Sequence, residues 1–381
     1  MEKILFNKAI YLPSAFGYME EVIRDRKIAG DGKYTKLCSE WMENRFSAQK
    51  VLMTTSCTSA LEMSALLLDL NPGDEIIMPS FTFVSTASAF VLRGCIPVFV
   101  DVRPDTMNID ERLIEGAISD KTKAIVVVHY GGVSCEMNEI LRIAEKYNLP
   151  VIEDAAQGVM ASYKDKYLGT IGTFGCYSFH ETKNYTMGEG GALIINDPKY
   201  IERAEILREK GTNRSKFYRG EVDKYTWVDL GSSFLPSEIN ASYLYGQLEI
   251  ADDINETRLR AWKLYMELLL LLKQKGFIEL PTVPNDCNHN AHLFFIKTSS
   301  LSERTELLRY LRSNNIAAVF HYVPLHSSIE GEKVGRFHGK DVYTTKESNK
   351  LVRLPLFYDI TEDEIRYIAG KIMDFYEATN R

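Results

Sequence analysis

One lysine in this sequence has the strongest potential for covalent chemistry. Lys183 lies in the stretch SFHETKN, a few residues after a short apolar run. The glycines around it allow the backbone to approach a ligand closely; they are Gly172, Gly175, Gly188, Gly190 and Gly191. A lysine removed from water loses proton affinity, and its neutral amine can attack a carbonyl. A lysine taken alone is more often a solvated surface group, so its neighbours decide the interpretation.

Apolar walls and a carboxylate are expected near this lysine. The neighbouring Phe174, Tyr177 and Phe179 could supply the walls. Asp154 ends the apolar run of the segment VIEDAAQ, and ligands of open α/β sheets bind beyond the carboxyl ends of strands. A carboxylate there could pair with a protonated ring nitrogen and keep the ring electron-poor. A helix cap is an equally good interpretation of Asp154 taken alone.

Two further strand ends carry small polar and aromatic residues. The segment TTSCTSAL, 54–61, opens a helix, and the free N–H groups of a helix N-terminus form an anion site. Ser178 could add a hydroxyl for a phosphate. An aromatic residue of PSFTFVST, 79–86, could stack on a planar ligand, although most such residues belong to a core. Each feature is weak alone, but together they meet four demands of pyridoxal 5′-phosphate: phosphate cradle, stacking ring, carboxylate and lysine.

The elements that position these residues alternate between strands and helices. Apolar runs predict strands at 51–53, 75–78, 97–101, 124–128, 151–154, 176–179 and 192–195. Helices are predicted between them, for example at 57–68 and 136–147, the latter with apolar residues at the spacing of a buried helix face. This alternation is typical of an α/β fold with a largely parallel sheet covered on both faces.

The pattern changes near residue 236. Residues 236–272 predict a long helix, with Asn255, Glu256 and Arg258 on exposed faces, followed by a strand at 292–297 and a helix at 303–312. We therefore expect a large domain over 1–235 and a smaller α+β domain over 236–381.

Composition limits the function. The 381 residues have a formal charge of −7, which argues against nucleic acid or an anionic membrane as partner. The six cysteines form no CxxC pair and predict neither a metal site nor disulfides, which indicates a cytoplasmic protein. No signal peptide is expected at the start, and the longest aliphatic run, 268–272, is too short to span a membrane.

The chain resembles the DegT/DnrJ-type sugar-nucleotide aminotransferases over nearly its whole length, from about residue 6 to residue 353. The resemblance implies the aspartate aminotransferase-like fold, pyridoxal phosphate fold type I, and an enzyme that depends on this cofactor. The combination of the motifs at 153–157, 178–184 and 188–193 is specific. The matching motifs are GDGKYT (30–35), PSFTFVSTASA (79–89), PVFVDV (97–102), EDAAQ (153–157), SFHETKN (178–184), GEGGAL (188–193) and HYVPLH (321–326).

The resemblance also implies roles for single residues. Lys183 would bind the cofactor aldehyde, and Asp154 would face the ring nitrogen. The remaining cofactor contacts would come from Ser56, Cys57, Thr58, Phe83, Gln157, Ser178 and Ser233. Ser56 and Ser233 stand where many relatives have glycine and asparagine, respectively, which puts the role of Ser233 in doubt. The candidates for binding the substrate are Arg214, Lys216, Arg219, Lys224, His321 and Tyr322, although a solvated loop is an equal interpretation of the basic ones.

The stretches SFHETKN and REKGTNRSKF are most similar to the subgroup that aminates dTDP-4-keto-6-deoxy-D-glucose for enterobacterial common antigen. The resemblance thus implies L-glutamate as amino donor, dTDP-4-amino-4,6-dideoxy-D-galactose as product, and a homodimer with shared active sites. Amination at C3, or formation of the gluco epimer, stays an alternative. A regulator that binds the cofactor without turnover is less favoured. A nicotinamide enzyme is disfavoured because GEGG at 188–191 is not GxGxxG and precedes a strand.

Overall fold

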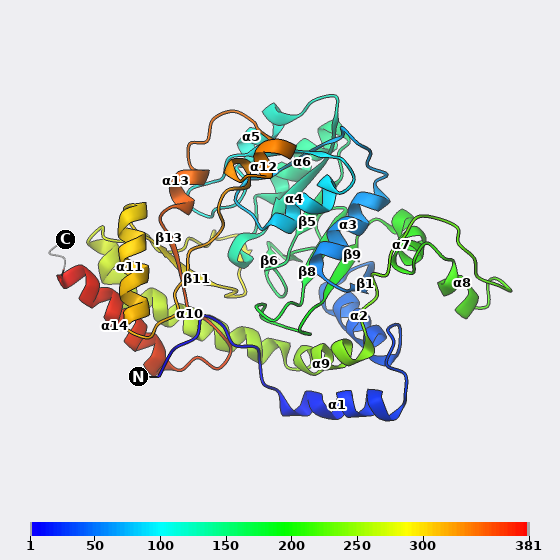
Figure 1. Ribbon diagram of the computed structural model, residues 1–381, viewed down its shortest axis with the longest axis horizontal. Helices are drawn as coiled ribbons and strands as arrows, with labels where there is room; N and C mark the ends of the chain where they lie inside the picture. Colours follow the sequence, from blue (N-terminus) through cyan, green and yellow to red (C-terminus); the bar gives the residue numbers. More distant parts are fainter. Residues whose placement is uncertain (1, 379–381) are drawn as a thin grey trace.

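Short apolar runs of the chain form a mixed eight-stranded sheet in the computed structural model, which describes residues 2–378 (Figure 1). The strand order is β1-β9-β8-β5-β4-β2-β3-β12. Within this sheet β9 alone runs opposite to its neighbours β1 and β8, and the other described pairings are parallel. The strands are β1 (Lys50–Thr54), β2 (Glu75–Pro79), β3 (Ile96–Val100), β4 (Thr122–Val128), β5 (Val151–Asp154), β8 (Phe174–Ser178), β9 (Gly191–Ile195) and β12 (Arg336–Phe337).

Both faces of this sheet are buried. Leu52 and Val126 point into one core with helices α3 and α4, whereas their neighbours Val51 and Val127 point into the other core with α2, α6 and α9. Successive side chains of a strand point to opposite faces, so a strand covered on both sides must be apolar throughout. The predicted α/β fold with a mostly parallel sheet is confirmed.

Helices cover the two faces and the periphery. Figure 1 shows α3 and α4 beside the sheet and α1 apart from it at the edge of the molecule. The helices of this part are α1 (Pro13–Arg24), α2 (Lys33–Phe46), α3 (Cys57–Leu67), α4 (Val84–Val91), α5 (Glu111–Ala117), α6 (Met137–Tyr147), α7 (Ile201–Arg208), α8 (Arg214–Tyr218) and α9 (Glu238–Leu248). Short 3₁₀ turns occupy Tyr130–Gly132, Pro198–Tyr200 and Leu325–Ser327.

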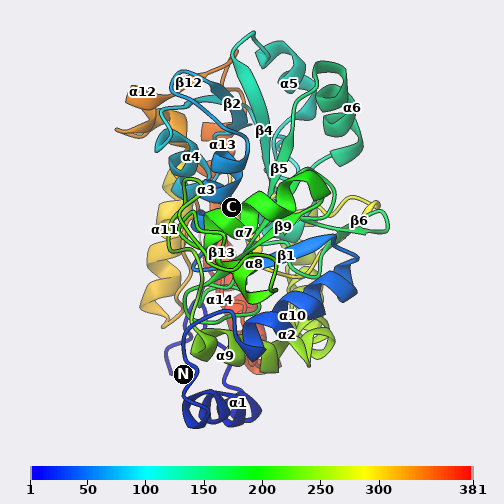
Figure 2. The same ribbon diagram turned by 90° about the vertical axis from the view of Figure 1, so that its right-hand side faces the viewer.

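The C-terminal part has a core of its own. Two antiparallel strands pack with α10, α11 and α14 around Tyr265, Phe294 and Leu354, and Ile4 joins them from the start of the chain. Figure 2 shows these helices side by side below and behind the large sheet. The elements are α10 (Ala251–Gln274), β11 (Phe294–Lys297), α11 (Leu301–Ser313), α12 (Gly331–Val334), α13 (Thr344–Ser348), β13 (Leu351–Leu354) and α14 (Glu362–Ala378). A small sheet is formed by β6 (Ser162–Tyr163), β7 (Lys166–Tyr167) and β10 (Cys287–Asn288).

The division into domains 1–235 and 236–381 stays a prediction. The predicted boundary falls just before α9, which packs in the core beneath the large sheet through Ala241 and Leu244. Residues 1 and 379–381 of the predicted domains lie outside the described part. No helix within residues 2–378 is long and apolar enough to cross a membrane.

Two expectations about this region were wrong. The helix predicted over 236–272 is two helices, α9 and α10, which are separated at residues 249–250. Arg258 is not exposed but buried, because the segments just before β11 and just after β13 lie over its face of α10, and the carbonyls of Ala291, His292 and Leu356 accept its hydrogen bonds. A helix pattern alone does not show which other element will cover a given face.

Candidate active site

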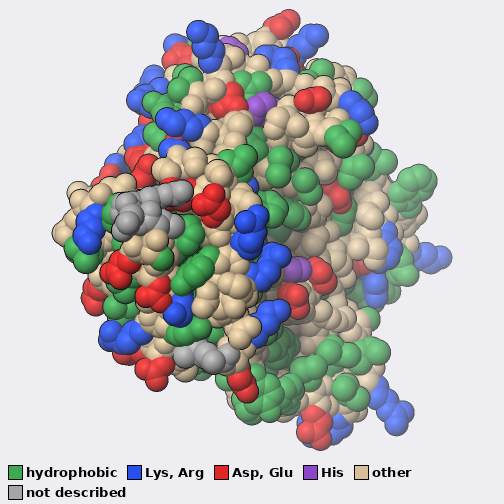
Figure 3. All heavy atoms as spheres, turned by 60° about the vertical axis from the view of Figure 1, so that its left-hand side comes forward, with side chains coloured by type: hydrophobic (Ala, Val, Ile, Leu, Met, Phe, Trp, Pro, Cys, Tyr) green, Lys and Arg blue, Asp and Glu red, His purple; other side chains and the backbone are tan. Residues whose placement is uncertain are grey.

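A cavity of about 820 Å³ opens where β5 and β8 end. It contains side chains from both parts of the molecule. Figure 3 shows charged side chains of both signs around a hollow in which hydrophobic side chains gather. Of the residues predicted to bind cofactor or substrate, those that line the cavity are Ser56, Cys57, Thr58, Phe83, Asp154, Gln157, Ser178, Lys183, His321 and Tyr322.

Lys183 enters the cavity from the turn that follows β8. Its backbone N–H donates to the carbonyl of His180 at 2.9 Å, which closes the turn. Burial lowers the pKa of the Lys183 amine, and the nearby Cys57 and Asp154 oppose that shift in part. The structure therefore favours a neutral, nucleophilic amine more than a surface position would.

Asp154 lies at the end of β5 and is 6% exposed. Its carboxylate accepts hydrogen bonds from the Thr86 hydroxyl at 2.6 Å and from the Ala156 backbone N–H at 3.2 Å. Burial raises the pKa of this carboxyl, while the hydrogen bonds from Thr86 and Ala156 work against the increase. A partly desolvated carboxylate held by two donors is suited to face a cationic nitrogen. Thr86 was not among the residues predicted from the sequence, although it lies inside the motif PSFTFVSTASA.

The N-terminus of α3 forms a turn beside Lys183. Ser56 is extended and caps the helix, because its hydroxyl accepts from the Ser59 N–H at 3.0 Å. The Thr58 hydroxyl donates to Ser85 at 2.8 Å. Burial raises the pKa of the Cys57 thiol well above its usual value, so the thiol adds no negative charge at neutral pH. The turn thus offers hydroxyls and N–H groups to an anion.

Gln157 and Tyr322 connect the two parts of the molecule across the cavity. The Gln157 side chain accepts from the Gly131 N–H at 2.7 Å and donates to the Tyr322 hydroxyl at 3.1 Å. Tyr322 has a φ of 21°, which is strained for a non-glycine residue. Phe83 is 56% exposed at the start of α4, and its ring lies 6.3 Å from that of Tyr322. An aromatic ring is therefore available at the cavity, as the sequence suggested.

Two histidines at the cavity are held by neutral partners. His321 lies 2.7 Å from the Tyr130 hydroxyl, and His292 lies 3.1 Å from the side-chain oxygen of Asn184, the residue after Lys183. Burial lowers the pKa of both imidazoles, which keeps them neutral. His292 was not among the residues predicted from the sequence, since it falls at the start of a predicted strand with no motif around it.

The aromatic residues expected to form walls do not line the cavity. Phe174, Tyr177 and Phe179 are fully buried in the cores on either side of the sheet. Their rings instead hold β8 and the turn after it against the neighbouring elements. The walls come from residues that are distant in sequence, among them Phe6, Leu293 and Phe320.

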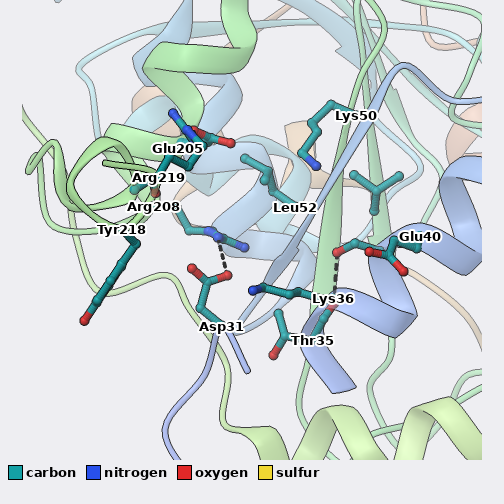
Figure 4. A pocket seen from close by; sticks show the side chains of 13 residues that line it. Asp31, Thr35, Lys36, Glu40, Lys50, Leu52, Glu205, Arg208, Tyr218 and Arg219 are labelled. Atoms are coloured by element: carbon teal, nitrogen blue, oxygen red, sulfur yellow. Dashed lines mark hydrogen bonds and ion pairs between the residues drawn. The ribbon is translucent and has the colours of Figure 1, made fainter. Parts of the chain in front are cut away.

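The basic residues proposed for the substrate lie elsewhere in this chain. Figure 4 shows a second cavity, of about 310 Å³, with Lys36 and Glu40 from α2 on one side and Arg219 on the other. The residues in question form ion pairs: Arg214 with Glu209, Lys216 with Glu202, and Arg219 with Glu205 and Glu221. Lys224 and Ser233 are exposed in the segment that follows α8. One chain does not bring these residues to Lys183, and their role stays a prediction.

The fold and the cavity define an aminotransferase of pyridoxal phosphate fold type I. Residues 14–373 match the DegT/DnrJ/EryC1/StrS aminotransferase family, and the chain belongs to it. It is 34% identical over 352 residues to the uncharacterised protein MJ1066 of Methanocaldococcus jannaschii, which covers 90% of this chain and 89% of that protein. It is 32% identical over 367 residues to the pleiotropic regulatory protein of Geobacillus stearothermophilus, over 96% and 95% of the two chains. The aminotransferase TlmJ of Streptoalloteichus hindustanus has a TM-score of 0.91 at 25% identity, over 99% of this chain and 100% of that one.

The chain is thus a sugar aminotransferase that depends on pyridoxal 5′-phosphate, and structures of the same fold include the pyridoxal phosphate form. The residues at the cavity fit this group. A Cβ at Gly191 would lie 2.4 Å from the Ser56 carbonyl carbon, so glycine there keeps the turn at α3 close to the sheet. That turn, the Asp154 carboxylate and the desolvated Lys183 amine meet the needs of phosphate, ring nitrogen and aldehyde.

Proposed function

We propose that the protein transfers an amino group from L-glutamate to C4 of dTDP-4-keto-6-deoxy-D-glucose. The products are dTDP-4-amino-4,6-dideoxy-D-galactose and 2-oxoglutarate. The observation that carries the catalytic part is one cavity that contains both the Lys183 amine and the Asp154 carboxylate, beside the N-terminus of α3. The choice of sugar rests on the motifs SFHETKN and REKGTNRSKF, which resemble those of the C4 aminotransferases.

Bound pyridoxal phosphate supplies an aldehyde that exchanges amines and a ring that stabilises negative charge on the adjacent carbon. Lys183 would hold that aldehyde. Its amine, once free, would take the proton from the α-carbon of the donor as a base and give it back as an acid. The lowered pKa of Lys183 favours the neutral amine, which is the form that can accept a proton.

The other residues of the cavity would hold and orient the cofactor and the sugar. Asp154 keeps a proton on the ring nitrogen, and Thr86 holds the carboxylate in place. The turn at Ser56 and Thr58, with Ser178, binds the phosphate, and Cys57 contributes its backbone N–H. Phe83 would stack on the cofactor ring, Gln157 would donate to the ring hydroxyl, and His321 and Tyr322 would contact the sugar.

A second copy of the chain completes the site in this proposal. Ser233 and the basic residues near α8 are too far from Lys183 in their own chain, but lie in an exposed segment that also carries Tyr225 and Trp227. We infer a cytoplasmic homodimer in which this segment reaches the partner's cavity. Light scattering on a sizing column tests it, and a cofactor-loaded monomer with full activity would refute it.

The test of the reaction is an assay with L-glutamate and a panel of dTDP- and UDP-linked 3-keto and 4-keto sugars, with products identified by NMR. The proposal requires the galacto amine at C4. A product aminated at C3, or the gluco epimer, would support the alternative sugar specificity instead. Mass alone does not distinguish these products, because they are isomers.

Lys183→Ala should lose the absorbance of the covalently bound cofactor and all turnover. Lys333→Ala, a change of an exposed lysine on α12, serves as the matched control and should keep both. Retained turnover in the Lys183 variant would contradict the assignment.

A regulatory role is a second candidate, because one relative is a pleiotropic regulatory protein. In that case the protein would bind the cofactor with Lys183 but aminate no sugar of the panel. Turnover of any sugar at an ordinary enzyme rate, about 1 per second or faster, would decide against it.

A further inference from the structure

The motif GDGKYT, residues 30–35, lies outside the cavity of Lys183, since none of its residues lines that cavity. It forms the turn before α2 and the first residues of that helix. Its contacts are with Arg208 and Glu238, which directly precede and follow the segment 209–237. We call this segment the arm; it contains α8 and Ser233. The motif therefore holds both residues from which the arm extends.

An ion pair fixes the start of the arm. The Asp31 carboxylate accepts from Nη2 of Arg208, the last residue of α7, at 2.9 Å. Figure 4 shows the two side chains pointing toward one another at the wall of the second cavity. Arg208 is only 4% exposed, and an enclosed guanidinium depends strongly on its counter-charge. Asp31 has a φ of 65°, a conformation that aspartate and asparagine tolerate better than most residues.

A buried carboxylate fixes the end of the arm. Glu238, the first residue of α9, is 1% exposed. It accepts from the backbone N–H groups of Gly32, Tyr34 and Thr35 at 2.9, 2.7 and 3.1 Å, and from the Thr35 hydroxyl. These N–H groups belong to the N-terminus of α2, where a negative charge is favourable. Glu238 thus caps a helix that is distant in sequence.

Two glycines of the motif allow these close contacts. A Cβ at Gly32 would lie 2.6 Å from the carboxyl carbon of Glu238, and a Cβ at Gly30 would lie 2.0 Å from the Pro236 carbonyl oxygen. A larger residue at either position would push the motif away from the end of the arm.

The two ends of the arm pair with each other. Glu209 and Ser233 form an antiparallel bridge, and the Phe234 N–H donates to the Arg208 carbonyl at 3.3 Å. Ser233 is the residue predicted to reach the phosphate of the partner's cofactor. Its position therefore depends on the residue that Asp31 holds.

The same pairing also reaches the turn at α3 within one chain. The Phe234 carbonyl accepts from the Thr55 N–H at 2.8 Å. Thr55 directly precedes Ser56, the cap of α3. A series of contacts thus leads from Asp31 through Arg208 and Phe234 to the turn proposed to bind the phosphate.

We propose that Asp31 and Glu238 are positioning residues for the cofactor phosphate. They fix both ends of the arm, and so hold Thr55 in its own chain and Ser233 toward the partner's site. Neither side chain lines the cavity, so each acts through the arm. The inference rests on the proposed function, in which the turn at Ser56 and Thr58 binds the phosphate.

Titration of the cofactor-free protein with pyridoxal phosphate and with pyridoxal, followed by absorbance, tests this proposal. Asp31→Asn keeps the shape and the left-handed backbone but removes the charge. It should weaken binding of pyridoxal phosphate by about fivefold or more and leave binding of pyridoxal within about twofold. Glu238→Gln should show the same selectivity, because pyridoxal lacks the phosphate.

Asp69→Asn is the matched control. Asp69 also has a positive φ, 51°, and pairs with an arginine of α7, Arg203, at 2.7 Å. It makes that contact outside the arm, and Arg203 keeps Asp229 as a partner in the variant. Both ligands should bind to it as they bind to the wild type.

Two results would overturn the proposal. One is wild-type binding of pyridoxal phosphate by both the Asp31 and the Glu238 variant. The other is an equal loss of affinity for both ligands, since the two residues would then support the fold in general. Circular dichroism reports folding, and if Glu238→Gln fails to fold, Asp31→Asn decides. Cofactor binding needs no sugar, so a failure of the C4 assay is distinguishable from a failure of this inference.

Discussion

The hydroxyl of Thr86 donates a 2.6 Å hydrogen bond to the carboxylate of Asp154, although the two residues are 68 positions apart. Thr86 lies in the first turns of α4, and Asp154 ends β5. The hydroxyl oxygens of Thr86 and Thr82 lie 2.7 Å apart. When Thr82 donates to Thr86, the proton of the Thr86 hydroxyl is free for the Asp154 carboxylate. The bond fixes the orientation of the carboxylate that we propose to face the ring nitrogen of the cofactor.

Replacement of Thr86 by valine should therefore weaken cofactor binding. Without this donor the pKa of Asp154 rises further, since the hydrogen bond stabilises the charged form. A hydrogen bond to a charged group contributes about 1.5 to 3 kcal/mol, so the dissociation constant of the cofactor should increase by about tenfold or more. Titration of the cofactor by absorbance measures it. Thr86→Ser keeps the donor and should bind as the wild type does; equal binding by the valine variant would rule out the role.

Arg258 should be essential for stability rather than for chemistry. Its guanidinium donates to the carbonyls of Ala291, His292 and Leu356, at 3.2, 2.8 and 3.3 Å. Arg258→Met leaves these buried acceptors without their partner and should lower the free energy of unfolding by about 3 kcal/mol. Arg260→Met, two residues along α10 and exposed, should change it by less than about 0.5 kcal/mol. Urea unfolding of the two variants compares them, and similar losses would contradict the prediction.

This arginine also shows where inference from sequence fails. The periodicity of α10 identifies the apolar face of the helix correctly. The chain that follows α10, however, also covers the face that carries Arg258. Thr86, His292 and Arg353 were missed for the same reason, because each owes its position to a distant segment. Lys183 and Asp154 could be predicted, since strand ends of an α/β sheet converge and each lies in a motif with its own local signal. Of the lining from the C-terminal part, His321 and Tyr322 lie in the motif HYVPLH and were predicted, whereas His292 and Arg353 carried no such signal.

The stability of the protein should fall as the pH drops below neutrality. Burial lowers the pKa of His289, which packs on Trp262, to about 4. In the unfolded chain its pKa is about 6.5, so between these values the unfolded state binds more protons and is favoured. The stability that neutral His289 contributes is complete above about pH 6.5 and is lost progressively toward pH 4.

At about pH 5.5 the unfolding free energy should be about 1.4 kcal/mol lower than at about pH 7.5 through this residue alone. The lowered pKa values of His292 and His321 act in the same direction. Urea unfolding at the two pH values measures the difference. His289→Gln should show a smaller difference than the wild type; an unchanged difference would remove His289 as a cause.

The close packing around Gly191 explains why the second of the two adjacent glycines in the motif GEGGAL has no side chain. It is paired with Thr54 of β1 and Ser178 of β8, so it lies between two strands that lead to the cavity. A Cβ there would lie 2.4 Å from the carbonyl carbon of Ser56 and 2.5 Å from the amide nitrogen of Cys57. Both are backbone atoms of the turn at α3, which cannot move away as a flexible side chain can.

Gly191→Ala should accordingly displace that turn. We expect a loss of about 1 to 3 kcal/mol in stability from overpacking, together with weaker binding of the cofactor phosphate. Gly370→Ala, in α14 where nothing lies within 4 Å of the added Cβ, is the matched control and should gain about 0.5 to 1 kcal/mol. Unfolding in urea and titration with pyridoxal phosphate and with pyridoxal, which lacks the phosphate, separate the effects. If the alanine variant at 191 loses affinity for both ligands equally, the turn is not the phosphate site.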